Sequence, residues 1–133
     1  MNIQGGCLCG RVRYEVTGQL YDTHHCHCSM CRRHHGSAFS TSAKLTPGEF
    51  NWLSGEDLVK VYQSSPGIGW GFCSECGSSL VGTNNGEIIM VTLGTIDGDP
   101  GPRADSHIFV GSKAEWHDIT DNIPQFKKRS NTG

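Results

Sequence analysis

Hydrophobic and polar residues alternate along several short segments of the chain. Between Gly10 and Gly18, the side chains of Val12, Tyr14 and Val16 would fall on one face of an extended segment, with charged residues on the other. A period of two residues is typical of a strand that buries one face. The alternation therefore predicts a strand here, packed against a hydrophobic core.

The next stretch of the chain combines extended segments with tight turns. Residues 21–28 are predicted to be extended, residues 29–35 to form one helical turn, and residues 37–45 to form a strand. Residues 46–49, Thr-Pro-Gly-Glu, resemble a helix capping box with Pro47 at the first helical position. We therefore expect a short helical turn after the third segment.

Short strands separated by turns are expected along the rest of the chain. Residues 54–57 are polar and predict a hairpin loop between two strands. In the stretch 83–86, Asn85 and Gly86 tolerate the positive backbone angles of a tight hairpin turn. The tail after Pro124 is polar and basic, which predicts a frayed end. The expected strands of this half are 50–53, 58–63, 68–72, 78–82, 87–93 and 106–110.

Many short strands with little helical periodicity indicate a mainly β domain. The 133 residues are close to the common size of one domain. We expect residues 1–126 to form a single domain, followed by a polar basic tail at 127–133. The 18 glycines fit a chain with many turns.

Composition and charge exclude several classes of protein. With 35% hydrophobic residues and no long apolar run, the chain is expected to be a soluble globular protein without a membrane span. A net charge of -2 disfavours a nucleic-acid binder, although Lys127, Lys128 and Arg129 form a short basic cluster. The first residues show no basic segment followed by an apolar one. We therefore expect a cytoplasmic protein whose cysteines do not form disulfides.

Seven cysteines fall in three groups, and this odd number suits metal binding better than disulfides. Cys73 and Cys76 form a Cys-x-x-Cys-Gly turn, in which Gly77 is expected to supply a special backbone angle. Cys7 and Cys9 are spaced so that both side chains leave the same face of an extended segment. We predict a closed, structural zinc site of four cysteines; the alternative is that they are buried free thiols.

The third group, Cys26, Cys28 and Cys31, offers three ligands in a compact stretch. Three protein ligands with an open fourth position are typical of catalytic zinc, which can bind a substrate thiol as thiolate or polarise an aldehyde oxygen. Arg32 and Arg33 follow directly and would either grip the carboxylates of an anionic substrate or form a solvated basic turn. A nearby histidine would close the site if it supplied a fourth ligand. The candidates are His24, His25, His27, His34 and His35.

Four segments together resemble the glutathione-dependent formaldehyde-activating enzyme family, which also includes centromere protein V. They are GGCLCGRVRYEV, CHCSMCRRHHG, GFCSECGSSL and HIFVGSKAEW, and the resemblance runs from about Gly6 to about Phe126. It implies a β-tent fold of antiparallel sheets and two zinc ions per chain, the second of them in a site that can be labile or vacant. The matching positions are Cys7, Cys9, Cys73 and Cys76 for the structural zinc, and Cys26, Cys28 and Cys31 for the catalytic zinc.

The resemblance also implies a reaction, the formation or breakdown of S-hydroxymethylglutathione from glutathione and formaldehyde. We therefore expect a zinc-dependent carbon–sulfur lyase of thiol–aldehyde adducts, whose partners are a small thiol such as glutathione and an aldehyde. The alternative is a zinc-stabilised binding module without catalysis, because a fold does not determine a function. In the fourth segment, Lys113 or His107 would contact an anion. The alternative is that His107, Phe109 and Trp116 simply pack.

Overall fold

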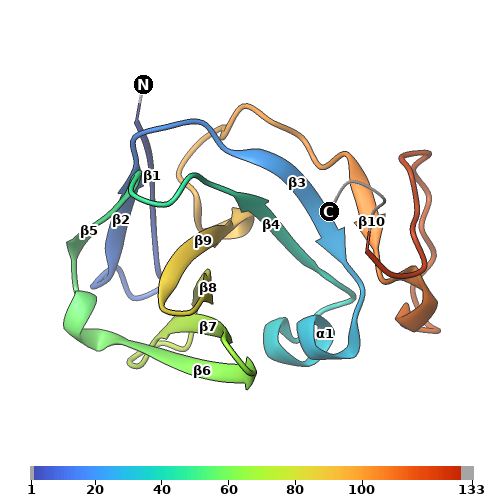
Figure 1. Cartoon of the computed structure of the whole chain (residues 1–133), viewed down its shortest axis with the longest axis horizontal. Helices are drawn as coiled ribbons and strands as arrows, with labels where there is room; N and C mark the ends of the chain where they lie inside the picture. The colour runs from blue at the N-terminus through green and yellow to red at the C-terminus, as the bar shows by residue number, and fades with distance from the viewer. Residues whose placement is uncertain (1, 130–133) are drawn as a thin grey trace.

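The structure is a computed structural model, and it describes residues 2–129. In that range the chain folds into two β-sheets and one α-helix, α1 (Ser29–His35), as Figure 1 shows. The smaller sheet has the strand order β1-β2-β5, and the larger has the order β10-β3-β4-β9-β8-β7-β6. The strands are β1 (Ile3–Gly6), β2 (Arg13–Val16), β3 (Tyr21–Cys26), β4 (Ser40–Lys44), β5 (Phe50–Ser54), β6 (Val59–Ser65), β7 (Ile68–Cys73), β8 (Ser79–Asn84), β9 (Glu87–Thr92) and β10 (Ser106–Ile108). Short 3-10 helices occupy Glu56–Leu58, Leu93–Thr95 and Val110–Ser112.

The mainly β prediction is confirmed, and the pairing adds one detail to it. Neighbouring strands run antiparallel, except that β10 pairs with β3 in parallel, so the large sheet is mixed. In Figure 1, the small sheet stands at one end of the molecule and β10 lies toward the other. In this view, α1 lies between β4 and β6, the edge strand of the large sheet opposite β10. No helix in the described part of the chain is long and apolar enough to cross a membrane.

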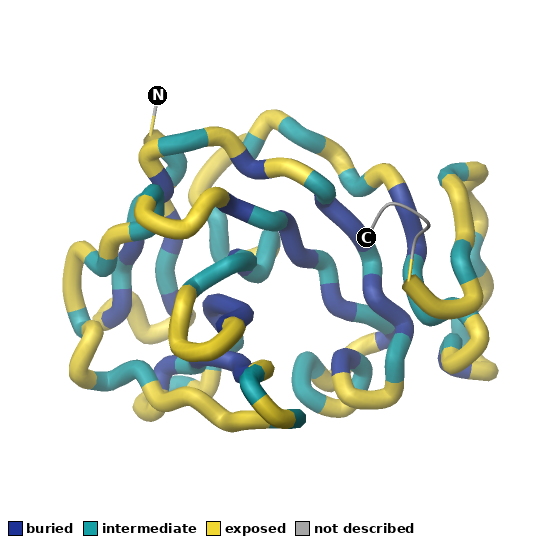
Figure 2. Tube along the Cα trace, in the orientation of Figure 1, coloured by how far each residue is buried: buried dark blue, intermediate teal, exposed yellow. Residues whose placement is uncertain are grey.

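The alternation seen in the sequence around β2 places its hydrophobic side in the core, as predicted. Val12, Tyr14 and Val16 are each 0% exposed. They pack in one cluster with residues of the large sheet, including Leu80 and Val91. Figure 2 shows that buried residues follow the middle strands of the large sheet, whereas many of the connecting loops are exposed. The core therefore joins the two sheets.

Replacing Tyr14 with Phe is expected to lower the free energy of unfolding by about 1 kcal/mol. The Tyr14 hydroxyl lies 2.7 Å from Thr95 Oγ1, whose own hydrogen is donated to the Thr92 carbonyl, so Tyr14 donates. Burial raises the pKa of Tyr14 from 10.0 to about 12. The phenol therefore stabilises the fold fully below pH 10.0 and loses this contribution as pH rises toward about 12. Denaturant unfolding at pH 7 and in that alkaline range measures both effects.

The control for this prediction is Tyr62→Phe, because the Tyr62 side chain is 64% exposed on β6. It should leave the free energy of unfolding unchanged. Equal unfolding free energies for Tyr14→Phe and the unaltered protein at pH 7 would contradict the assigned hydrogen bond.

The segment Thr46 to Glu49 forms a β-turn, so the predicted helical turn is wrong. The backbone N–H of Glu49 donates to the Thr46 carbonyl at 3.1 Å, and Gly48 has φ +97°. Proline in the second position and a glycine with positive φ in the third are the marks of a type II turn. Pro47 and Gly48 are compatible with this turn as well as with a helix capping box. The chain enters β5 directly after the turn.

The predicted hairpin at residues 54–57 is also wrong, because β5 and β6 belong to different sheets. Gly55 has a left-handed backbone and lies against the Arg11 carbonyl, where a Cβ atom would collide with it. The 3-10 helix that follows then turns the chain into the large sheet. The hairpin predicted at Asn85 and Gly86 is confirmed, since both have positive φ and they join β8 to β9.

The C-terminal segment is held against β10 and the residues after it. His107 N–H donates to the Pro124 carbonyl and Phe126 N–H donates to the His107 carbonyl, both at 2.9 Å. Phe109 N–H donates to the Lys128 carbonyl at 2.8 Å. The prediction that the chain frays after Pro124 is therefore wrong for the residues up to Lys128. The rest of the predicted tail, residues 130–133, lies outside the described residues.

Candidate metal centres and the adjoining cavity

Four cysteines from distant parts of the chain meet at one point, as the sequence predicted. The sulfur atoms of Cys7, Cys9, Cys73 and Cys76 all lie within 4.8 Å of one another. The Cys7–Cys9 and Cys9–Cys73 sulfur pairs are 3.5 and 3.9 Å apart. Four sulfurs at tetrahedral corners about 2.3 Å from a zinc ion would be about 3.8 Å apart. This cluster therefore has the spacing of a four-cysteine zinc site.

Two tight turns create this four-cysteine cluster. After Cys7, the chain reverses at Gly10, which has φ +80° and donates to the Cys7 carbonyl, and Val12 N–H donates to Cys7 Sγ at 3.3 Å. After Cys73, the turn closes with a 2.7 Å hydrogen bond from Gly77 N–H to the Cys73 carbonyl. Gly77 has φ +81°, so its predicted backbone role is confirmed.

Hydrogen-bond donors around the four-cysteine cluster favour thiolates. The Ser78 hydroxyl lies 3.3 Å from Cys76 Sγ, and this contact is the largest of the effects that lower the pKa of Cys76 to about 5. Ser78 Oγ in turn accepts a hydrogen bond from the backbone of Leu8. Thiolate sulfur is the form that binds a metal, so these donors support metal binding.

The second cluster is formed by Cys26, Cys28 and Cys31, whose sulfurs also lie within 4.8 Å of one another. Cys26 ends β3, and Cys28 is the N-cap of α1, where its sulfur accepts from Cys31 N–H at 3.3 Å. The one-turn helix predicted at 29–35 is thus confirmed, and it ends at Gly36 in the left-handed conformation. The short helix brings Cys31 back over the end of the strand.

Without a bound cation, a negative charge on one sulfur of this trio disfavours a negative charge on the others. Hydrogen bonds from Cys26 and Cys31 lower the pKa of Cys28 strongly, and the same sharing, followed by burial, raises the pKa of Cys26. The trio thus stabilises one thiolate at the expense of the others. A cation bound by all three would remove that competition, because a coordinated thiol is deprotonated. The donor set therefore fits a metal ion with a soft, thiolate-binding character.

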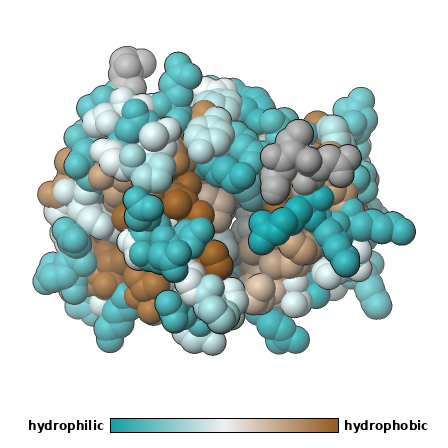
Figure 3. All heavy atoms as spheres, in the orientation of Figure 1, coloured by the Kyte–Doolittle hydropathy of each residue, from teal (hydrophilic) through white to brown (hydrophobic). Residues whose placement is uncertain are grey.

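The trio lies on the wall of a cavity of about 420 Å³. The wall also has an apolar part from β7, β9 and the residues after β10, which includes Trp70, Met90 and Phe109. Polar and charged side chains line the rest of it. The four-cysteine cluster is not part of this lining. Figure 3 shows hydrophobic side chains gathered near the middle of this face. Among the described residues, the trio therefore adjoins this space, which is large enough to hold a small molecule, and the four-cysteine cluster does not.

The charged residues on the cavity wall differ from those singled out in the sequence. Arg32 is half-buried and Arg33 is exposed on α1, and neither lines the cavity. Lys44 and Arg129 line it instead. No local spacing signalled these two, because Lys44 lies on β4 and Arg129 in the C-terminal segment. Only the fold brings them to the same cavity as the trio.

None of the five candidate histidines joins the trio in the described structure, where the cluster consists of the three cysteines alone. His24 lines the cavity, with Nδ1 2.8 Å from the Asp22 carbonyl oxygen. His34 Nε2 lies 3.1 Å from Ser79 Oγ, and His35 packs edge-on against Trp70. His25 and His27 belong to a separate polar network.

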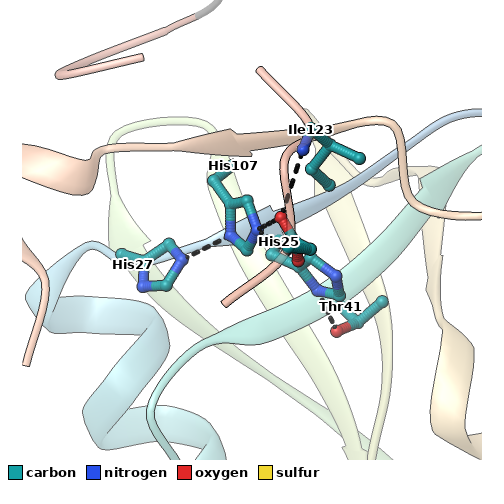
Figure 4. Close-up of polar contacts among 6 residues, drawn as sticks. His25, His27, Thr41, His107 and Ile123 are labelled. Atoms are coloured by element: carbon teal, nitrogen blue, oxygen red, sulfur yellow. Dashed lines mark hydrogen bonds and ion pairs between the residues drawn. The ribbon is translucent and has the colours of Figure 1, made fainter. Parts of the chain in front are cut away.

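That network is shown in Figure 4 and includes side chains from β3, β4 and β10. His27 Nε2 and His107 Nδ1 are 2.8 Å apart, and His107 Nε2 lies 3.0 Å from a carboxylate oxygen of Asp121. His25 Nδ1 contacts Thr41 Oγ1 at 2.7 Å. The hydrogen bond from His107 lowers the pKa of Asp121. His107 is thus a buried packing residue and lies outside the cavity lining, as does Lys113, which donates to the carbonyls of Ala114 and His117.

Comparison with known proteins points to one family. A family model described as glutathione-dependent formaldehyde-activating enzyme matches residues 2–112. A protein of Halomonas elongata, provisionally named as such an enzyme, is 29% identical over 129 residues, covering 90% of this chain and 82% of that protein. A protein of Pyrenophora teres f. teres with the same provisional name is 30% identical over 86 residues. That match covers 61% of this chain and 45% of the relative, so it spans less than half of the longer protein.

A solved structure supports the same relationship. The chain is similar to a Rhodobacter sphaeroides protein of known crystal structure, with 26% sequence identity and a TM-score of 0.58. The match covers 92% of this chain and 98% of that chain. The two proteins therefore share their architecture over nearly their whole lengths.

Proposed function

The chain belongs to the glutathione-dependent formaldehyde-activating enzyme family, and from this premise we propose that it is a zinc-dependent carbon–sulfur lyase of thiol–aldehyde adducts. Cys26, Cys28 and Cys31 hold the catalytic zinc, and the four-cysteine cluster holds a structural one. One observation carries the proposal: the trio lines a cavity of about 420 Å³, whereas the other cluster does not. Three protein ligands beside a cavity leave room for a substrate atom.

The reaction forms one bond between the thiol sulfur and the aldehyde carbon, and it moves one proton from the thiol to the carbonyl oxygen. A zinc ion held by the trio would supply Lewis-acid character at the open coordination position. The protein positions the three sulfurs through the end of β3 and the first turn of α1. Trp70, Met90 and Phe109 present apolar walls, which reduce the water that competes with the thiol for the aldehyde.

The direct test is nuclear magnetic resonance exchange spectroscopy on formaldehyde and glutathione at equilibrium with their adduct. The proposal predicts that the zinc-loaded protein speeds exchange between free and adduct signals above the uncatalysed rate. If protein with both clusters metallated leaves the exchange rate unchanged for glutathione and for other small thiols, the proposal is wrong. The chain would then be a zinc-stabilised binding module.

A further inference from the structure

Arg129 lies on the wall of the same cavity as the cysteine trio, although 98 positions separate it from Cys31 in sequence. Its guanidinium carbon is 5.8 Å from the centre of the Phe109 ring, and Phe109 also lines the cavity. A guanidinium over an aromatic face is attracted by the ring quadrupole. The contact therefore holds the charge of Arg129 beside the apolar wall.

The backbone that carries Arg129 is fixed by the strand end beside it. Phe109 N–H donates to the Lys128 carbonyl at 2.8 Å, and Val110 N–H donates to the Phe126 carbonyl at 2.9 Å. Phe109 itself has φ 57°, a left-handed conformation that a phenylalanine rarely adopts. Strained residues of this kind cluster at ligand sites, where the surrounding structure holds them in place. Arg129 therefore directly follows a backbone segment that hydrogen bonds hold in place.

The other strong charges on the cavity wall neutralise each other. Lys44 Nζ lies 2.7 Å from Asp22 Oδ2, and both residues line the cavity. Within residues 2–129, no carboxylate pairs with Arg129. Three thiolates around a divalent ion would carry a net charge of about -1, which repels an anionic substrate. Arg129 supplies a countercharge within the same cavity.

We propose that Arg129 is a substrate-binding residue that selects a small thiol bearing a carboxylate, with the carboxylate held at the cavity wall and the sulfur directed to the trio. The identity of the site as a thiol site rests on the proposed function. Arg129 lies beyond residues 2–112, the part that the family model matches. The selectivity is thus assigned to a residue of the C-terminal segment.

The test is calorimetric titration of the full, zinc-loaded chain with 3-mercaptopropionate and with its neutral amide, 3-mercaptopropanamide. The unaltered protein should bind the carboxylate roughly tenfold more tightly than the amide, because a guanidinium–carboxylate contact is a charge-assisted hydrogen bond. Arg129→Gln should abolish that preference and leave the affinity for the amide unchanged. Arg129→Lys keeps the charge and should retain part of the preference.

The matched control is Lys128→Gln, which removes the same charge from an exposed neighbour that does not line the cavity. It should keep the full preference for the carboxylate. An equal loss of preference in Lys128→Gln and Arg129→Gln would overturn the proposal, since it would show unspecific attraction by the basic segment. An unchanged preference in Arg129→Gln would overturn it as well.

The outcome also separates this inference from the proposed function. If the carboxylate preference depends on Arg129 but no thiol–aldehyde exchange is catalysed, the selectivity stands and the lyase is wrong. If exchange is catalysed equally well with both thiols, and Arg129→Gln changes neither rate nor affinity, the lyase stands and the role of Arg129 is wrong. If neither thiol binds, the role of Arg129 is wrong, and exchange with glutathione decides the lyase separately.

Discussion

Replacing Cys28 with Ser is expected to reduce thiol–aldehyde turnover by roughly 100-fold or more and to leave the fold intact. The sulfur of Cys28 is one of three that meet at the cavity, and a serine hydroxyl is a poor ligand for a metal that prefers thiolate. Serine is also a good N-cap, so its Oγ can still accept the hydrogen bond from Cys31 N–H that starts α1. Exchange spectroscopy and denaturant unfolding on the same preparation measure the two effects.

The matched control for this variant is Ser29→Ala, because Ser29 is exposed in the same turn and is not a member of the trio. Its turnover should equal that of the unaltered protein. If Cys28→Ser keeps full turnover while Ser29→Ala does too, the trio does not perform the chemistry.

Replacing Cys73 with Ser is expected to destabilise the protein by several kcal/mol, or to prevent folding altogether. Cys73 is 0% exposed and lies in the cluster that joins the turn after β1 to the end of β7. Metal binding to a structural site contributes directly to the free energy of folding, so losing one of four ligands removes much of it. A buried hydroxyl without a suitable partner adds a further cost.

Thermal and denaturant unfolding, together with zinc analysis, test this second prediction. Ser74→Ala is the matched control, because Ser74 is exposed in the same turn and supplies no sulfur. It should have the same unfolding temperature and free energy of unfolding as the unaltered protein. A free energy of unfolding within about 1 kcal/mol of the unaltered value for Cys73→Ser would show that the four-cysteine cluster is not what stabilises the fold.

The grouping of Cys26, Cys28 and Cys31 could be predicted from sequence because its determinants are local. The spacing of Cys26, Cys28 and Cys31 fits one strand end and one helical turn, and the structure contains both. Asn85 and Gly86 require a tight turn through their own backbone preferences, so that hairpin was predictable too.

The wrong predictions concern contacts that a local pattern does not contain. Gly55 could sit in a hairpin loop, but its close approach to Arg11 and the turn after it send the next strand to the other sheet. The fraying expected after Pro124 followed from polar composition, whereas backbone hydrogen bonds to the residues around β10 hold the segment.

The cavity wall was beyond sequence reasoning for the same reason. Its charged residues, Asp22, Lys44 and Arg129, come from parts of the chain far apart in sequence that the fold brings to one cavity. Arg32 and Arg33 adjoin the cysteines in sequence, yet the short helix places both away from the cavity lining. Proximity in sequence to a metal ligand therefore did not predict proximity to the space where substrate would bind.

The most direct measurement is the zinc content per chain of the unaltered protein and of Cys28→Ser, both purified without chelators and analysed by mass spectrometry of the metal. If the trio holds a metal ion beside the cavity, the unaltered protein will contain two zinc ions per chain and Cys28→Ser will contain one. One zinc ion per chain in both proteins would contradict a metal-binding trio, and with it the proposed mechanism.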